Sequence, residues 1–421
     1  MTHFVPDSSK GEIYQAICQL LSGGHDETAW EKFTQREWNE LVRIAGDEGV
    51  APLLHRRLAD QKDQATLPQR FESQFRDLRK RLAADYYKSS AQNQLLFAEL
   101  GRILQALNGA GTDSILLKGA ALGVFLYPDL ALRPMNDLDL LVDRRSLDAA
   151  AEAIRSLGYL VEFPEHLGMA GWIDEAINHH IHLRGGSNQK LVVELHWSLV
   201  AGDADWRSPS LEWFWRESSK VGLPIQVSTD SSGQGAHPPS RQTRILSPTA
   251  TLLYQAAHLI LQHGEYRSIL LWFYDLHLLV EKCQREIRWE ELPEIARELH
   301  WADATHTALM AIRGMFRSSV PEMVIDQLEA YSEPRARRII ALNARAPDQR
   351  TKDTWQGLQV YDWPTRMRLI FALIFPRPAY LRWRYNPNPA WLWPVYYLYR
   401  WLDLSKDGLA SLFRKKRGQP G

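Results

Sequence analysis

Three acidic residues lie in stretches of sequence that otherwise resemble buried β-strands. Asp137 and Asp139 stand one residue apart in RPMNDLDLLV, and Glu194 is the sole acid in LVVELHW. Strands favour branched and aromatic side chains, so carboxylates at these positions need a reason. Because side chains two apart on a strand point to the same face, Asp137 and Asp139 would present their carboxylates together, about 6.6 Å apart at the backbone.

A divalent cation is the usual partner of carboxylates placed side by side, because two anions on one surface repel each other. Mg²⁺ prefers oxygen ligands, so we expect two Mg²⁺ ions, with Mn²⁺ as the alternative, bound by Asp137, Asp139 and Glu194. If the two strands are neighbours, the three acids would hold the metal pair used for in-line phosphoryl displacement. The competing interpretation is that the acids lie on the solvated side of an edge strand.

The segment LLKG, upstream of the aspartates, predicts a phosphate-binding turn. A strand ends here, Gly119 provides a flexible bend and a helix begins, and backbone N–H groups at a helix N-terminus receive phosphate oxygens. Lys118 and Arg133 add positive charge beside this turn. We therefore expect Lys118, Gly119 and Arg133 to contact the phosphates of a nucleotide.

A β-hairpin is expected in HHIHLRGGSNQKLVVELHW, where two alternating stretches flank a Gly-Gly-Ser-Asn turn. One face would be apolar, and the other would carry His180, His182, Glu194 and His196. In the register drawn from this pattern, His180 lies opposite Glu194. We expect His180 to orient another side chain or to contact phosphate; ligation of a transition metal and plain surface exposure are the alternatives.

The sequence beyond residue 246 offers candidates for binding the acceptor. Asp275 is a lone acid in ILLWFYDLHLLV, and an acid in so apolar a helix is rarely buried without a partner. It would either serve the acceptor, as a ligand or general base, or pair with His258 or Arg267. His258 and His263 are five residues apart, too far round an α-helix to share a face, so both are mainly structural candidates. The acceptor-binding candidates are therefore His182, His258 and Asp275.

The elements that must position these residues indicate an α+β fold built from several parts. The chain has 421 residues, more than the roughly 250 that a single core usually reaches. Residues 1–108 have the pattern of an N-terminal helical region, and residues 109–228 that of a core with strands and helices. Residues 229–246 have the composition of a loop or linker, and residues 247–421 are expected to form a C-terminal helical domain with an aromatic and basic tail.

LKGAALGVFLYPDLALRPMNDLDLLV, followed by VELHW, resembles the uncharacterised nucleotidyltransferase family of the DNA polymerase β superfamily. The flanking segments GVAPLLHRRL, LSPTATLLYQAAHL and LLWFYDLHLLV extend the resemblance over roughly residues 35 to 300. It implies a polymerase β-like core, a small mixed sheet with helices, with Asp137 and Asp139 as metal ligands, Glu194 as the third acid and Gly119 in the phosphate-binding turn. The wider superfamily usually has Gly-Ser in that turn, whereas this chain has Gly119-Ala120, so we infer that Lys118 or Arg133 compensates.

The activity that the resemblance implies is transfer of a nucleoside monophosphate from an NTP to a hydroxyl acceptor. The acceptor would be a small molecule, a glycan precursor, a peptide or a protein, and family members encoded with surface polysaccharide assembly associate the activity with polysaccharide biosynthesis. One alternative is a phosphotransferase similar to the LicD proteins. The other is a degenerate domain that serves as a binding or regulatory module, which the three intact carboxylates disfavour.

Composition and charge exclude several other classes of protein. The 50 basic and 50 acidic residues balance, so no sequence-specific binding of nucleic acid is expected. The two cysteines, far apart and without ligand-spaced histidines, argue against a disulfide framework or a zinc site. The first residues lack the pattern of a secretion signal, and no apolar stretch reaches the length of a membrane span, so we expect a cytoplasmic protein.

The tail from Trp363 to Trp401 is dense in Trp, Tyr, Pro and Arg and precedes a basic cluster at Arg414 to Arg417. Amphipathic aromatic side chains beside cations suit peripheral contact with the inner face of the membrane, which is one of two interpretations. The alternative is a helical packing domain that uses its aromatic side chains as core and has a solvated basic end.

Overall fold

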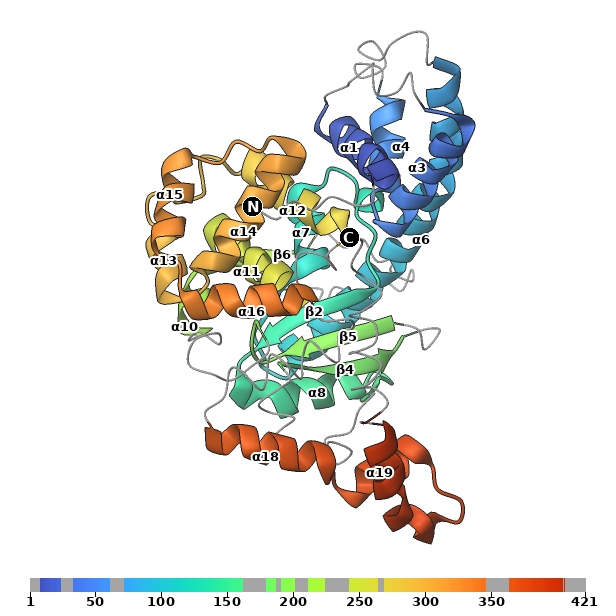
Figure 1. Cartoon of the computed structure of the whole chain (residues 1–421), viewed down its shortest axis with the longest axis vertical. Helices are drawn as coiled ribbons and strands as arrows, with labels where there is room; N and C mark the ends of the chain where they lie inside the picture. Colours follow the sequence, from blue (N-terminus) through green and yellow to red (C-terminus); the bar gives the residue numbers. More distant parts are fainter. Residues whose placement is uncertain are drawn as a thin grey trace, which may run out of the picture.

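A computed structural model describes residues 8–23, 33–60, 72–161, 179–186, 191–200, 211–223, 242–263, 269–345, 363–403 and 405 (Figure 1). Its centre is one mixed sheet of seven strands in the order β3-β4-β5-β2-β1-β7-β6. The strands are β1 (Ser114–Leu116), β2 (Asp137–Val142), β3 (Leu160–Val161), β4 (His180–Gly185), β5 (Leu191–His196), β6 (Ser218–Gly222) and β7 (Gln242–Leu246). Strands β2 and β5 are parallel neighbours, and β4 and β5 form the expected antiparallel hairpin.

One face of the sheet is covered by α6 (Glu72–Gly109) and α8 (Leu147–Arg155). Alternate residues of β2, from Leu138 to Val142, turn to this side and are buried among apolar residues of both helices. The period of two therefore sends Asp137 and Asp139 to the opposite face.

The opposite face of the sheet meets a layer of helices, of which α7 (Lys118–Leu126) and α11 (Pro248–Ala257) contact the strands. A single apolar core joins the N-terminal helices to α7, α11, the π-helix η5 (His258–His263) and α12 (Leu270–Lys282). The N-terminal helices in this core are α1 (Ser8–Ser22), α3 (Gln35–Asp47) and α4 (Ala51–Ala59). The remaining helices are α10 (Leu211–Arg216), α13 (Leu292–Glu298), α14 (Ala302–Phe316), α15 (Glu322–Ala330) and α16 (Pro334–Arg345), with the short 3₁₀ segments η2 (Leu130–Leu132) and η3 (Arg144–Ser146).

Helix α6 contributes to both cores. Phe75, Leu78 and Leu82 in its first half pack with the N-terminal helices, whereas Leu96 to Leu107 in its second half pack on the sheet. At 38 residues it is about 57 Å long. The N-terminal helical region expected over residues 1–108 thus also supplies one wall of the expected core.

The α+β class predicted from the sequence is confirmed, with one difference in the predicted linker. Residues 242–246 form β7, which pairs in parallel with β1, so this part of the expected linker is a strand of the sheet. The rest of the linker, residues 229–241, lies outside the described residues. Ser247 accepts a hydrogen bond from the Ala250 backbone N–H and Pro248 occupies the first turn of α11, so both residues favour a helix start here.

The C-terminal helices α18 (Trp363–Ile374) and α19 (Pro378–Tyr385), with the 3₁₀ segment η7 (Ala390–Val395), lie beyond α8, at the opposite end of the molecule from α1, α3 and α4 (Figure 1). Across the described part of the chain, no helix combines the length and the apolar character needed to cross a bilayer.

Candidate active site

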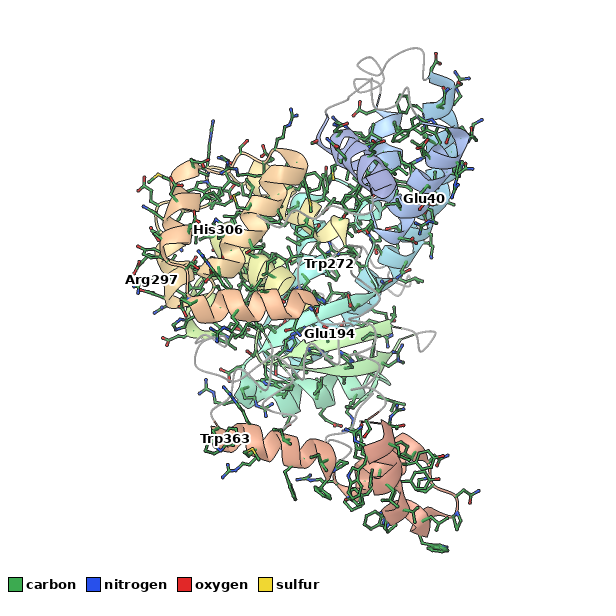
Figure 2. All side chains as sticks on the ribbon, viewed as in Figure 1. Glu40, Glu194, Trp272, Arg297, His306 and Trp363 are labelled. Atoms are coloured by element: carbon green, nitrogen blue, oxygen red, sulfur yellow. The ribbon has the colours of Figure 1, made fainter. Side chains whose placement is uncertain are left out.

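Three neighbouring strands bring polar side chains into one row. Asp139 on β2 pairs in register with Glu194 on β5, and Glu194 pairs with His182 on β4. The condition set from the sequence, that the strands carrying the acids are neighbours, is therefore met. Glu194 lies where the sheet meets the helical layer that contains Trp272 (Figure 2).

Lys118 is the cation that meets this row. Its Nζ lies 2.7 Å from Asp139 Oδ1 and 3.2 Å from Glu194 Oε2. The residue follows β1, has a φ of 43° and opens α7. A left-handed backbone costs a residue with a side chain about 1–3 kcal/mol, so the surrounding structure holds Lys118 in this conformation. The strained turn aims the ammonium group at the carboxylates.

The charges of the row stabilise one another. Burial disfavours the charged form of Lys118, but Asp139 and Glu194 outweigh this effect and hold the pKa of its ammonium well above the usual value. Burial likewise disfavours the charged form of Glu194, but hydrogen bonds from His182 and His196, together with Lys118, hold the pKa of this carboxyl well below its usual range. Glu194 is therefore an anion and Lys118 a cation at neutral pH.

Asp137 has the opposite electrostatic environment. Burial, together with the charges of Asp139 and Glu194, raises its pKa to about 6. The positive charges of Lys118 and Arg133 act to lower the pKa of Asp137, but they do not offset its burial and the repulsion among the three carboxylates. The electrostatic imbalance fits a divalent cation as the missing partner.

Replacing Asp137 with asparagine is expected to stabilise the metal-free protein above pH 6. The folded-state pKa is raised, so folding favours the protonated acid, and this group lowers stability as the pH rises from about 4 to 7. The gain from the substitution should be on the order of 2 kcal/mol at pH 7.5, after allowance for partial exposure, and should vanish near pH 4. Urea unfolding of EDTA-treated protein at both pH values measures it.

The control for this prediction is Asp143→Asn just beyond the same strand. Hydrogen bonds from Arg145 lower the pKa of Asp143 to about 2, so its substitution should slightly destabilise the protein at neutral pH. Equal effects of the two substitutions would contradict the electrostatic account of Asp137.

Two residues that the sequence did not single out complete the site. His196 is fully buried, and its Nε2 lies 2.9 Å from Asp139 Oδ1 and 3.3 Å from Glu194 Oε2. Tyr254 on α11 is also buried, and its hydroxyl has no hydrogen-bond partner within the described part of the chain. The alternating pattern had placed His196 on the face of Glu194, whereas nothing in the sequence marks Tyr254.

Arg133 and Asp275 pair with each other. The guanidinium donates to the Asp275 carboxylate from Nη2 at 2.8 Å and from Nε at 3.2 Å, and the Tyr127 hydroxyl donates to the same carboxylate at 2.7 Å. Both members of the ion pair are buried. Asp275 thus has a structural partner, as one of the two expectations held, but this partner is Arg133 and not His258; Arg267 lies outside the described residues. Of the two cations expected at the phosphates, Lys118 contacts the carboxylate row and Arg133 is held by Asp275.

Gly119 has no side chain and therefore leaves room for the guanidinium of Arg133. A Cβ at this position would stand 2.3 Å from Arg133 Nη1 and 3.1 Å from Met135 Cγ. The glycine thus allows the guanidinium to lie against the start of α7, which is a packing reason for the residue beside the predicted one of phosphate binding.

The hairpin register differs from the expected one by two residues. His182, and not His180, lies opposite Glu194, and its Nε2 is 3.3 Å from Glu194 Oε1. His180 lies opposite His196 and between two histidines, with its Nδ1 3.1 Å from His179 Nε2. Its Nε2 is 2.7 Å from His182 Nε2. The prediction that His180, His182, His196 and Glu194 share one face of the hairpin is confirmed.

His258 and His263 lie in contact, contrary to the expectation from α-helical geometry. Their Nε2 atoms are 3.3 Å apart because residues 258–263 form a π-helix, in which positions five apart come together. His258 is buried beside Tyr254, and burial, followed by the charge of Lys118, lowers its pKa well below the usual value. It is thus a neutral histidine close to the site, and its role toward an acceptor stays a prediction.

The cavity next to Lys118 is largely apolar. Its walls come from β1, α7, β7 and α11, and its polar lining groups include Lys118, Thr251, Tyr254 and Gln255. A triphosphate carries several negative charges, so this largely apolar cavity does not suit it.

The donor set is compatible with a divalent metal. Ligand atoms of Asp139, Glu194 and His196 all lie within 4.8 Å of one another. Asp137 is not part of this close group, although its carboxylate is near enough for Asp139 and Glu194 to raise its pKa. Carboxylate oxygens are the ligands that Mg²⁺ prefers, so the three acids fit this ion.

Comparison with known proteins gives one match. The family model described as "Uncharacterised nucleotidyltransferase" matches residues 34–317. This range is more than half of the chain and includes the whole site, from Lys118 to Asp275. No curated protein matches the chain, and no solved structure matches it either.

Proposed function

Since the chain belongs to the uncharacterised nucleotidyltransferase family, we propose that it transfers a nucleoside monophosphate from an NTP to a hydroxyl acceptor in a Mg²⁺-dependent reaction. The observation that carries the proposal is the in-register pairing of Asp139 with Glu194, with Lys118 Nζ within 3.2 Å of both. A buried site that joins two carboxylates, a third nearby acid and a lysine is suited to phosphoryl chemistry, in which positioning and charge stabilisation do most of the catalysis.

Asp137, Asp139 and Glu194 are the residues that would hold the metal. Bound Mg²⁺ supplies neutralisation of the triphosphate charge and polarisation of the attacking hydroxyl. His196 Nε2 donates to the Asp139 carboxylate and lies 3.3 Å from Glu194 Oε2, and it therefore fixes their orientation, as outer partners of metal ligands usually do.

Lys118 is the proposed phosphate-binding group. Its ammonium lies against the same carboxylate oxygens that a metal would take. The side chain of Lys118 has a flexible four-carbon stem, so its ammonium can turn toward the phosphates while the backbone of the turn stays fixed. This assignment also accounts for the alanine at the position where the wider superfamily usually has serine.

Glu194 and Tyr254 are the candidates for handling the acceptor proton. Glu194 is held as an anion and accepts hydrogen bonds, so it can take the proton or ligate the second ion. Burial, opposed by the charge of Lys118 and reinforced by those of Asp139 and Glu194, raises the pKa of Tyr254, so its hydroxyl stays protonated and can donate to a substrate oxygen.

The test is incubation of the purified protein with Mg²⁺ and each of the four labelled NTPs, with and without hydroxyl acceptors of the classes named above. Release of pyrophosphate with label transferred to an acceptor is the expected result. Transfer of a phosphocholine-type group without pyrophosphate would favour the LicD-like alternative. Absence of both a product and Mg²⁺-dependent NTP binding would contradict the proposal and indicate a degenerate binding module.

A further inference from the structure

We propose that His180, His182 and Glu194 form a binding site for one divalent transition-metal ion of the zinc class, separate from the oxygen-ligand position at Asp137 and Asp139. The proposal rests on the proposed function only in that both use Glu194. The two oxygens of this residue face different partners: Oε2 faces Lys118 and His196, whereas Oε1 faces His182.

The strand geometry presents the three ligands together. His180 and His182 are two apart on β4 and share a face, and Glu194 lies directly across from His182. His182 Nε2 is 2.7 Å from His180 Nε2 and 3.3 Å from Glu194 Oε1, and the ligand atoms of the three residues lie within 4.8 Å of one another. Ligands held about 2.0–2.1 Å from a tetrahedral ion are separated by about 3.3 Å, so small shifts suffice to bind one.

Hydrogen bonding alone satisfies this arrangement poorly. His182 Nε2 faces both an imidazole nitrogen and a carboxylate oxygen, and a single N–H cannot point at both. A cation shared by all three atoms removes the conflict. Mg²⁺ prefers oxygen ligands, whereas imidazole nitrogens with one carboxylate suit zinc and its neighbours in the first transition series.

The surroundings of His180 support a ligand role. His179, which is buried, lies 3.1 Å from His180 through its Nε2, at the nitrogen that points away from His182. Histidine ligands usually have their second nitrogen engaged in this way, which fixes the ring orientation. Three protein ligands leave a tetrahedral ion with an open position, as in catalytic rather than structural sites.

The experiment uses the full chain, freed of metal with EDTA and then titrated with Co²⁺ in excess Mg²⁺. We expect one Co²⁺ per chain with visible d–d absorption bands, which Zn²⁺ displaces and Mg²⁺ does not. His182→Ala and, as a second and milder variant, His180→Gln should each weaken Co²⁺ binding at least about tenfold. The matched controls are Asp137→Asn, which removes an oxygen ligand of the other position, and His306→Ala on α14; both should keep the bands.

Absence of the bands in the wild type, or Co²⁺ binding with wild-type affinity in both histidine variants, would overturn the metal site. Because pyrophosphate release is measured separately, a wild-type protein that transfers nucleotide without binding Co²⁺ would contradict this inference and leave the proposed function in place.

A second observation, independent of the site, concerns the C-terminal helices. Ten of the large apolar side chains that the structure leaves exposed lie between residues 363 and 402, and they are Trp363, Met367, Phe371, Phe375, Trp391, Val395, Leu398, Tyr399, Trp401 and Leu402. The rest of the described chain exposes seven such side chains. Soluble surfaces rarely gather so many, and such a patch marks an interaction surface. The alternative of an aromatic core therefore does not describe these ten side chains.

Charge favours a lipid surface as the partner. Residues 363–405 contain six arginines and one acidic residue. Arg368, Arg377, Arg382 and Arg384 are exposed, and Arg382 lies 5.4 Å from the ring centre of Trp393. Arginines beside exposed aromatic side chains suit an interface where rings enter the head-group region and cations meet anionic lipids. We propose that this surface, formed by α18, α19 and η7, binds the face of an anionic membrane.

Sedimentation of the full chain with vesicles tests this docking surface. Binding to phosphatidylcholine vesicles containing phosphatidylglycerol should exceed binding to pure phosphatidylcholine vesicles and should decrease with salt. The triple variant Phe371→Ser, Trp391→Ser, Leu402→Ser should lose at least about tenfold in binding, whereas Tyr87→Ser, at an equally exposed ring on α6, should bind like the wild type. Absence of vesicle binding would overturn the proposal, as would a concentration-dependent dimer that the triple variant abolishes while vesicle binding is unchanged.

Discussion

Replacing Asp139 with asparagine is expected to lower NTP turnover by about a thousandfold or more. The carboxylate contacts Lys118 and His196 and pairs in register with Glu194, so it lies at the centre of the row. The neutral amide has the same shape but is a poor metal ligand and cannot offset the charge of the lysine. Pyrophosphate release at saturating Mg²⁺ and NTP measures the loss.

The fold should tolerate this change, because Glu194 still pairs with Lys118. Circular dichroism and thermal unfolding of the Asp139→Asn variant should therefore resemble those of the wild type. Asp143→Asn, a change of the same type just beyond β2 at a partly exposed residue, should retain full turnover. Turnover retained in Asp139→Asn would remove Asp139 from the catalytic assignment.

Breaking the ion pair between Arg133 and Asp275 is expected to cost about 3–5 kcal/mol in the free energy of unfolding. Asp275→Asn leaves a guanidinium buried without a counter-charge, and Arg133→Met leaves a buried carboxylate; the side chains are only 7% and 1% exposed. Urea unfolding at neutral pH measures both losses. The double variant Arg133→Met, Asp275→Asn should lose far less than the sum of the two single losses, because neither charge is then left alone.

An exposed pair provides the matched control for this buried pair. Arg297 and Glu294 form an ion pair on α13 with side chains that are 48% and 46% exposed. Glu294→Gln should leave the free energy of unfolding nearly unchanged, as for other solvated pairs. If the single losses at Arg133 and Asp275 were equally small, or simply additive, the pair would not be the structural link described here.

This link also has a positional effect on the site. Arg133 precedes β2 by only a few residues and lies against Gly119, so its attachment to α12 through Asp275 fixes both the turn and the approach to Asp137. An acid that the sequence offered as an acceptor ligand thus acts as a positioning residue, and this explains its place in an apolar helix.

Local periodicity was enough to predict which face carries the site. A period of two in DLDLLV and LVVELHW places the acids opposite the apolar residues, and the structure has them there. The same period could not determine the hairpin register, because a slip of two residues leaves every side chain on its original face. For this reason the sequence pattern placed His180 opposite Glu194, whereas the structure has His182 there.

Contacts between distant segments could not be predicted from local sequence. Arg133 and Asp275 are 142 residues apart, and nothing near either one identifies the other. Tyr254 reaches the site only because α11 packs on the sheet. The contact between His258 and His263 depends on one π-helical segment. In an α-helix, residues five apart would not share a face, so the sequence predicted no contact between them.

The length of α6 limits how far the protein can be shortened. The second half of this helix, from Leu96 to Leu107, packs on the apolar face of β2, and the aspartates lie on the other face of this strand. A fragment beginning at Gly109 would expose the apolar face of β2 to water, and such an exposed apolar surface favours aggregation. Any minimal active fragment is therefore expected to include Leu96 to Leu107 of α6, and substitutions in this half of the helix can lower activity without contacting a substrate.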